Sequence, residues 1–330
     1  RVMELAIYFT NIDRLSQIDE ALRFINLEKI PSFVSSAMFS PDPNHNDYIC
    51  NMNALTWLNV FTERGLDFSR LYFGQEFCPN LIPSASEIEQ AFYYSRQMEW
   101  AFTYVTGGYL PDAELKQVQR NLEKLAELTD QAEVVVNDWG VLWLLQEHFP
   151  QFEPVIGRLL NKQTRLNLFT KPGLPLPMHV DDITTPVDEL RTSQLNAYQD
   201  VSLSNPDYLA ALKSWGVKKI DMDVTPQGVK RPADGWGLDL GFYYPWGFLG
   251  TGRNCPTAGI ADPRRMYIVV DSPCPKPCRK YNCSPTFPQF PHKIVQRGPT
   301  LFMFHDDYAE AIFAVDARYE RFIFEPWIPL

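Results

Sequence analysis

Short apolar runs alternate with amphipathic segments along most of this chain, and this alternation restricts the fold more than any other feature. Segments with apolar residues at helical spacing lie at 12–26, 52–64, 86–97, 111–128, 139–148 and 206–215. Between them are runs with the length and the β-branched or aromatic content of strands, at 3–9, 71–74, 100–107, 132–138, 154–160, 218–224 and 238–244. Strands that alternate with helices form parallel sheets, so the sequence predicts an α/β fold.

A TIM-like (β/α) barrel, irregular or incomplete, fits this alternation better than a doubly wound sheet, because no G-x-G-x-x-G motif follows the first strand. The length of 330 residues suits one barrel. No repeat or clear linker divides the chain, so we expect a single domain over 1–330. Residues 290–330 are predicted to form a C-terminal elaboration, with short strands at 293–298, 300–306 and 319–326 around a helix at 307–317.

The stretch 251–283 holds four of the six cysteines in a C-x18-C-x3-C-x4-C series: Cys255, Cys274, Cys278 and Cys283. Prolines surround them, so we expect the thiols to lie on a stiff loop rather than on a helix face. Four converging thiolates are what an iron–sulfur cluster or a structural zinc ion requires. The spacing is standard for neither centre, and disulfides or scattered buried cysteines are the alternative.

The charge and the hydropathy pattern narrow the class of protein. A net charge of −10 argues against nucleic-acid binding, which needs clustered Lys and Arg. No apolar run has membrane-spanning length, so we expect no membrane contact. The chain opens on Arg1 rather than Met, as a trimmed chain does, and its first run resembles a strand rather than a signal peptide. We therefore expect a cytoplasmic protein whose thiols are available to a metal.

In (β/α) barrels the chemistry lies where the strands end. Such strand ends carry Glu76, Cys78, Thr106, Asn137, Asp138, Arg158, Asp221, Asp223 and Tyr243. Cys78 would share a layer with the cysteines of 251–283, whereas Cys50 is expected to be buried and inert. Neither H-E-x-x-H, H-x-x-E-H nor G-x-S-x-G occurs, so a hydrolase has no predicted nucleophile or metal water.

Structural roles are open for several of these polar residues. Asn137 and Asp138 could form the N-cap of the helix predicted at 139–148. The alternative for Asp221 and Asp223 is an ion pair with a nearby base: Lys218, Lys219 or Arg231.

Four stretches occur in the order and approximate spacing of peptidase family U thirty-two: 71–80 (LYFGQEFCPN), 135–145 (VVNDWGVLWLL), 156–163 (IGRLLNKQ) and 244–255 (YPWGFLGTGRNC). Over about residues 65–283 the chain resembles this family, and within it most the UbiU and UbiV accessory proteins of oxygen-independent hydroxylation, the UbiV branch above all. Despite its name, the family resembles TIM barrels with iron–sulfur clusters more than proteases. A long N-terminal region and the insert at 171–200 depart from the pattern, which leaves substrate and partner open.

The resemblance implies one [4Fe–4S] cluster on Cys78, Cys255, Cys274 and Cys278, with Cys283 in reserve. It also implies oxygen-independent hydroxylation, or a related redox modification, of a small organic or cofactor-precursor substrate, with a small anionic molecule as substrate or hydroxyl donor. One alternative is a non-catalytic iron–sulfur scaffold that binds a homologous subunit. Another is hydroxylation of tRNA or rRNA, and a peptidase is disfavoured.

A small anion beside a cluster needs a cation, and a guanidinium holds carboxylates bidentately. Arg158 and Arg253 are therefore the predicted clamps, and together with Asp138 and Asp223 they form the predicted catalytic set. As an alternative, Arg158 could only pair with Asp138 or Glu133.

Overall fold

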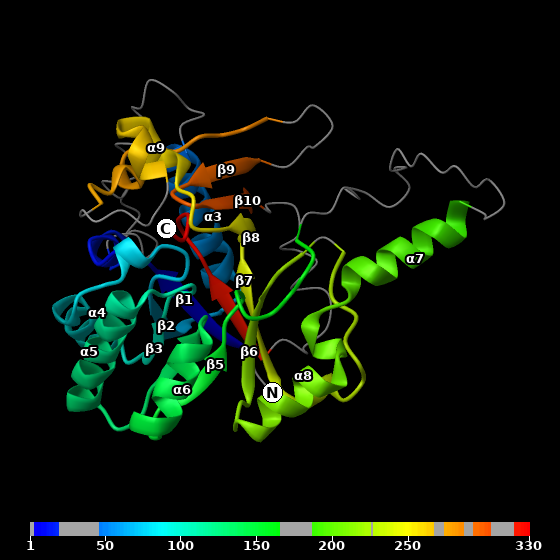
Figure 1. Ribbon diagram of the computed structural model, residues 1–330, viewed down its shortest axis with the longest axis horizontal. Coiled ribbons are helices and arrows are strands. Elements are labelled where there is room, and N and C mark those ends of the chain that lie inside the picture. Colours follow the sequence, from blue (N-terminus) through cyan, green and yellow to red (C-terminus); the bar gives the residue numbers. More distant parts are fainter. Residues whose placement is uncertain are drawn as a thin grey trace.

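The computed structural model describes residues 3–19, 46–165, 187–225, 227–266, 274–286, 293–304 and 320–330. Eight strands pair in parallel and close into a barrel in the order β1-β11-β7-β6-β5-β4-β3-β2 (Figure 1). These strands are β1 Glu4–Phe9, β2 Phe68–Gly74, β3 Ala101–Val105, β4 Glu133–Val136, β5 Glu153–Ile156, β6 Lys219–Asp223, β7 Asp239–Tyr244 and β11 Arg321–Phe324. The predicted TIM-like barrel is thus confirmed, and it is closed rather than incomplete.

Helices follow several of the barrel strands, and apart from one helix within the insert at 171–200, which was not predicted, they overlap the segments with helical apolar spacing. They are α3 Asn46–Glu63, α4 Ala85–Gln97, α5 Asp112–Leu128, α6 Trp139–His148, α7 Val187–Gln199 and α8 Pro206–Ser214. Helix α5 shows the pattern most clearly, because Val118, Leu122 and Leu125 form a buried stripe on one face. Figure 1 shows α4, α5 and α6 side by side against the barrel, whereas α7 extends away from it.

A second sheet lies at the end of the barrel where the strands finish. Strand β8 (Trp246–Thr251) follows β7 after one residue, and it pairs antiparallel with β10 (Thr300–Phe304), which pairs with β9 (Ile294–Arg297). Helix α9 (Pro256–Ala261) follows β8, at the top of Figure 1. This sheet and α9 form a cover over the C-terminal side of the barrel.

The seven predicted barrel strands are confirmed, but the eighth strand corrects the sequence analysis. Strand β11 was assigned to the C-terminal elaboration, and the structure inserts it between β1 and β7, where it closes the barrel. The helix expected at 12–26 is seen from 14 to 19, and its remainder lies outside the described residues, as do 171–186 and the helix expected at 307–317. In the described part of the chain, no helix is long and apolar enough to cross a membrane.

The barrel interior has a thin apolar layer with charged groups on both sides. Its buried members are Ala6, Tyr8, Tyr72, Val105, Val135, Val155, Tyr243 and Ile323. A larger apolar cluster fills the space between the barrel and its helices. The inner layer therefore separates the two ends of the barrel, and each end carries its own set of charged side chains.

Candidate functional site

Cys78, Cys255, Cys274 and Cys278, here called the cysteine group, come from separate parts of the chain. Cys78 follows β2 and precedes a short 3-10 helix, η1 (Pro79–Leu81), while Cys255 is the N-cap of α9. Cys278 lies in another 3-10 helix, η5 (Pro277–Arg279). Cys255 and Cys274 therefore lie outside the helices, as expected, whereas Cys278 lies in a short 3-10 helix that begins at a proline.

The cysteine group converges at the C-terminal side of the barrel. The pKa of Cys78 is raised to about 12, mainly by burial and in smaller part by the nearby thiols of Cys278, Cys255 and Cys274. Burial also raises the pKa of Cys278, with contributions from Cys255 and Cys274, and that of Cys255, with a contribution from Cys274. Every pair within the group is thus close enough for one thiol to affect the ionisation of the other.

Backbone N–H groups point at these sulfurs. The N–H of Ala258 donates to Cys255 Sγ at 3.4 Å, and the N–H of Lys276 donates to Cys274 Sγ at 3.4 Å. Lys276 adopts the left-handed conformation, with φ of 55°, which turns the chain between Cys274 and Cys278. Such donors stabilise a thiolate and tune the potential of a cluster that it binds.

One finding bears on the metal centre that would fit this group. In the residues that the structure describes, no three Cys, His, Asp or Glu side chains form a group able to hold one metal ion. A zinc ion draws its four ligands into a tight tetrahedron, with each sulfur about 2.3 Å from the metal. In a [4Fe–4S] cluster, by contrast, each thiolate binds a different iron atom.

Of the other two cysteines, only Cys283 has a described side chain. Cys283, the predicted reserve ligand, is exposed, and its backbone pairs with Gln296. It is not among the main contributors to the pKa of Cys78, Cys255 or Cys278. The side chain of Cys50 lies outside the described residues, so its expected burial stays a prediction.

Arg158 is the centre of a buried ionic network just below the cysteine group. The upper network consists of Glu76, Arg158, Arg165, Asp223 and Glu325, which follow or end the barrel strands. The Arg158 guanidinium donates to Glu76 Oε2 at 2.7 Å, to Asp223 Oδ1 at 2.7 Å and to Glu325 Oε1 at 2.6 Å. It also lies 3.9 Å from the ring centroid of Tyr243, and its side chain is 0% exposed.

These contacts change the role that the sequence suggested for Arg158. It pairs with neither Asp138 nor Glu133, so both suggested partners were wrong. Its N–H groups already face protein acceptors, which leaves no open fork for a ligand. Arg253, the other predicted clamp, is exposed, and one N–H reaches Tyr109 O at 3.5 Å. Its predicted role in binding stays a prediction.

Asp223 and Asp138 differ in what their carboxylates contact. Asp223 pairs with Arg158 and Arg165, not with the lysines or Arg231 suggested from the sequence. Asp138 caps α6, since its Oδ1 accepts the N–H of Gly140 at 2.8 Å, and its Oδ2 accepts that of Leu110 at 3.2 Å. The helix-cap alternative is therefore right for Asp138, and its predicted part in chemistry finds no support in these contacts.

Asn137 joins three strand ends instead of capping a helix. Its Nδ2 donates to Glu76 Oε1 at 3.2 Å and to Thr106 O at 2.9 Å, and its Oδ1 accepts the N–H of Leu159 at 3.0 Å. Gly157 permits this approach, because a Cβ there would lie 2.2 Å from Asn137 Oδ1. Asn137 thus holds Glu76 in place for Arg158.

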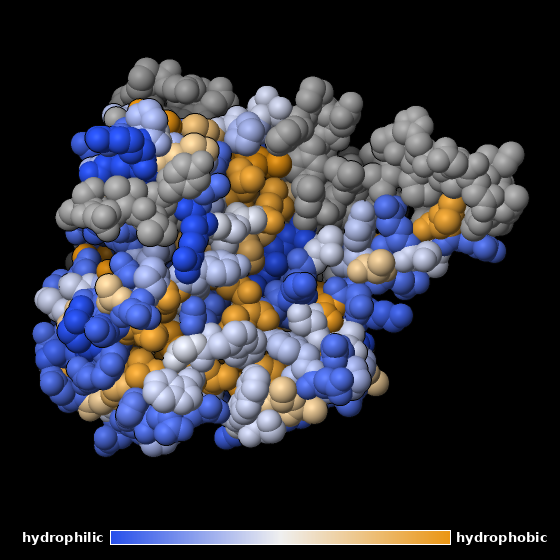
Figure 2. Space-filling view, in the orientation of Figure 1, coloured by the Kyte–Doolittle hydropathy of each residue, from blue (hydrophilic) through white to orange (hydrophobic). Residues whose placement is uncertain are grey.

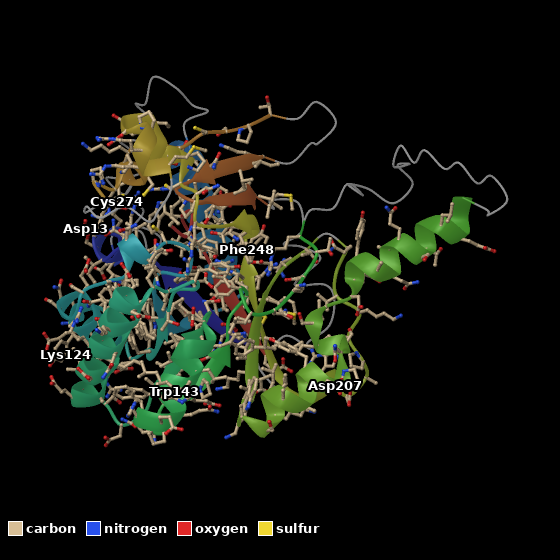
Figure 3. The ribbon with its side chains drawn as sticks, in the orientation of Figure 1. Asp13, Lys124, Trp143, Asp207, Phe248 and Cys274 are labelled. Carbon is tan, nitrogen blue, oxygen red and sulfur yellow. The ribbon has the colours of Figure 1, made fainter. Side chains whose placement is uncertain are left out.

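Two pockets open beside the upper network. A cavity of about 760 Å³ lies beside Phe248 and is lined by Arg165, Asn161 and Tyr208, among others. Phe248 is labelled in Figure 3, and Figure 2 shows apolar residues gathered in the middle of this face, below the three-stranded sheet. Asn161 is 1% exposed, and neither of its amide atoms has a hydrogen-bond partner. This side of the mouth is therefore polar but incompletely paired.

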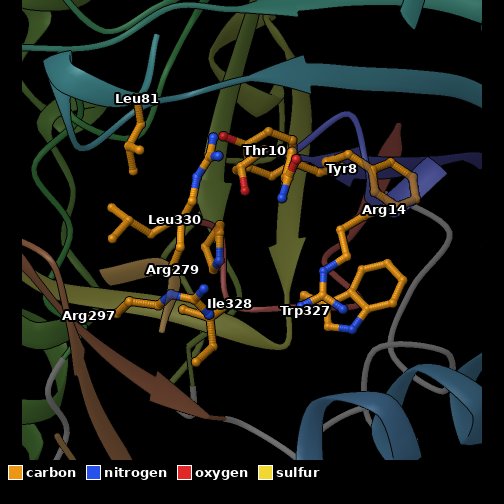
Figure 4. Close-up of a pocket in the computed structure, with 12 residues that line it drawn as sticks. Tyr8, Thr10, Arg14, Leu81, Arg279, Arg297, Trp327, Ile328 and Leu330 are labelled. Atoms are coloured by element: carbon orange, nitrogen blue, oxygen red, sulfur yellow. The ribbon is translucent and has the colours of Figure 1, made fainter. Parts of the chain in front are cut away.

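The second pocket lies on the cysteine side and is smaller, about 80 Å³. Three arginines line it, Arg14, Arg279 and Arg297, and we call it the arginine cavity (Figure 4). Arg279 is the residue after Cys278, and the Nε of Arg297 donates to Cys278 O at 2.9 Å. The sequence analysis missed all three arginines, as it missed Glu325 and Arg165.

Comparison of the chain with models of protein families, with curated proteins and with solved structures finds no match. The resemblance to peptidase family U thirty-two therefore stays a prediction from the four motifs. What the function rests on is the geometry of the barrel mouth.

Proposed function

We propose that this chain is an iron–sulfur protein in which Cys78, Cys255, Cys274 and Cys278 hold one [4Fe–4S] cluster. The observation that carries the proposal is the convergence of these four cysteines from three separate segments, with Cys283 left at the surface. Backbone N–H donors at Cys255 and Cys274 add support, because cluster thiolates are stabilised in this way. A cluster of this kind also favours a reducing compartment such as the cytoplasm.

We further propose that the protein takes part in redox or oxygen-independent hydroxylation of a small organic molecule, as catalyst or as accessory subunit. When bound, the cluster would supply one-electron chemistry at the barrel mouth. The upper network would keep the floor of the site dry and rigid, because Arg158, Glu76 and Asp223 are fully buried. Above all through burial, the pKa of Glu325 lies well above its usual range, so this carboxyl can keep a proton beside the site.

Cluster reconstitution tests the proposal directly. Protein purified without oxygen and supplied with iron and sulfide should bind about four iron atoms and absorb broadly near about 400 nm. Cys78→Ala should lose most of this iron, whereas Cys283→Ala, the matched control, should keep it. Colourless protein with one zinc per chain would overturn the cluster, and full iron in Cys78→Ala would remove that ligand from the set.

A second measurement separates catalyst from scaffold. Loaded protein that reduces or hydroxylates no small molecule, yet binds a second chain tightly, would support the non-catalytic alternative. A peptidase is disfavoured, since the described residues of the mouth form buried ion pairs and thiols instead of a nucleophile with an adjacent base. Metal-dependent cleavage of casein by pure protein, abolished by a substitution at the barrel mouth, would contradict this.

A further inference from the structure

The arginine cavity concentrates positive charge at one place on the barrel mouth. Arg14 follows β1, Arg279 lies in η5 and Arg297 ends β9, so three distant segments each contribute one guanidinium. In Figure 4, Arg297 and Arg14 enter from opposite sides. None of the side chains that line the cavity carries a carboxylate, as far as the chain is described. On a chain with a net charge of −10, this local excess of cations is unusual.

The remaining lining is mostly apolar, with a few polar groups. Thr10 and Asn11 add hydrogen-bonding groups, and the apolar part comes from Leu81, Phe9, Trp327, Ile328 and Leu330. A bare phosphate ion would leave this apolar wall without a partner. A small organic carboxylate fits this lining. The guanidinium groups can bind its carboxylate bidentately, and the apolar wall can pack against its hydrocarbon part.

We propose that the arginine cavity binds a small organic carboxylate next to the cysteine group. Its volume of about 80 Å³ suits a carboxylate headgroup with a few further atoms, while the rest of the molecule extends toward solvent. Arg297 donates a hydrogen bond to the backbone of Cys278, and Arg279 follows Cys278 in the sequence. The ligand would therefore lie beside the thiols. The statement that it also lies beside a cluster rests on the proposed function.

Arg279 and Arg297 would let an anion bind close to a negatively charged cluster. A four-thiolate [4Fe–4S]²⁺ centre has a net charge of about −2, which would repel an anion without intervening cations. This assignment moves the predicted anion site away from Arg158, whose guanidinium is enclosed by Glu76, Asp223 and Glu325. It also makes Arg253 dispensable for binding.

Calorimetric titration of the full chain, loaded anaerobically with iron and sulfide, tests the proposal. Benzoate is the carboxylate probe, benzamide its neutral isostere and sodium phosphate the inorganic anion. We expect benzoate to bind and benzamide not to. Arg279→Gln and Arg297→Gln should each weaken benzoate binding about ten- to a hundredfold, the loss typical of one charge-assisted pair. Lys280→Gln, which removes a neighbouring exposed charge outside the cavity, should leave it unchanged.

The outcomes separate this inference from the cluster. Iron content is measured on every sample, and thermal unfolding verifies the fold. Benzoate binding that depends on Arg279 in protein without iron would support the cavity and defeat the cluster. Full iron with equal affinity for benzoate and benzamide, or with unchanged affinity in both arginine variants, would overturn the cavity alone. Phosphate binding with no benzoate binding would also overturn it, because the apolar wall would then have no role.

Discussion

The two ends of the barrel are both closed by arginine–carboxylate networks, but the networks differ in burial and in charge balance. The upper network sets two arginines against three carboxylates, and the side chains of Arg158, Glu76, Asp223 and Glu325 are 0% exposed. The lower network, at the strand starts, sets three cations against three carboxylates with side chains 6% to 35% exposed: Arg70, Lys219, Arg321, Glu4, Glu133 and Glu153. One end is enclosed and has an unequal number of charges, whereas the other is balanced and partly hydrated.

This difference appears in the pKa values of the carboxyls. Burial alone would raise the pKa of Glu133 in the lower network, but Arg321, Arg70 and Lys219 outweigh it and lower the pKa to about 2. In the upper network burial prevails, and the pKa of Glu325 is raised well above its usual range even though Arg158 opposes the shift. A balanced network stabilises a fold, while one with surplus carboxyls keeps a proton, which is the distribution expected when chemistry lies at the strand ends.

The largest effect should follow from breaking the upper network at its centre. Arg158→Met leaves three buried carboxyls with Arg165 as their only cation within the network, so the free energy of unfolding should fall by about 3–5 kcal/mol. Urea-induced unfolding measures this loss. Arg158→Lys should be intermediate, because an ammonium cannot bond to all three carboxylates in the geometry of the fork.

Arg253→Met is the matched control for Arg158→Met. Arg253 is exposed, and its removal should change the free energy of unfolding by no more than about 0.5 kcal/mol. An Arg158→Met variant with wild-type stability but weakened benzoate binding would restore the ligand-clamp role that the sequence suggested.

The periodic features of this fold could be predicted from sequence, because strands and helices repeat their apolar residues at fixed intervals. All seven runs chosen as barrel strands are strands. Strand β11 was recognised as a strand but placed in the elaboration, since pairing between β1 and β11 joins residues more than 300 apart, as Glu4 with Arg321, and leaves no local signal.

Single residues at the mouth were less predictable, because their role depends on partners from other strands. The strand-end rule found Glu76, Arg158 and Asp223, but it could not tell that Arg158 joins the carboxylates instead of facing a ligand. The same rule applied to β11 would have found Glu325. Arg14, Arg279 and Arg297 carry no such signal, since only the fold brings them together.

Asp221 lies inside the barrel near its lower end, and its substitution should have the next largest effect on the free energy of unfolding. This effect should depend on pH. Burial is the main reason that its pKa is raised to about 7, although Arg321 opposes the shift, and its Oδ2 has no hydrogen-bond partner. Between about pH 4 and pH 7 the folded chain holds a proton that the unfolded chain has released, so stability falls as pH rises. Asp221→Asn lacks this loss, and its stability relative to wild type should rise by up to about 4 kcal/mol over that range.

Urea unfolding of both proteins at about pH 4 and pH 8 gives this difference. Because both curves share the lower and upper networks, other titrations largely cancel. A difference that stays constant with pH would show that Asp221 is ionised in the folded chain. The retained proton would then be confined to the upper end.

The smallest change in the free energy of unfolding should come from the lower network, where three cations pair with the same carboxylate, Glu133. In Arg321→Met, Glu133 keeps Arg70 and Lys219, so we expect a loss of only about 1–3 kcal/mol at neutral pH. The pKa of Glu133 is lowered in the folded chain, so its stabilisation is complete above about pH 4.5 and is lost as pH falls toward 2. Removing Arg321 weakens this lowering, and the variant should therefore approach wild-type stability as the solution is acidified.

Unfolding midpoints between about pH 2 and pH 7 measure the convergence, with the more exposed Arg70→Met as the matched control of smaller effect. A loss of stability as large as that of Arg158→Met, or one independent of pH, would contradict the proposed difference between the upper and lower networks.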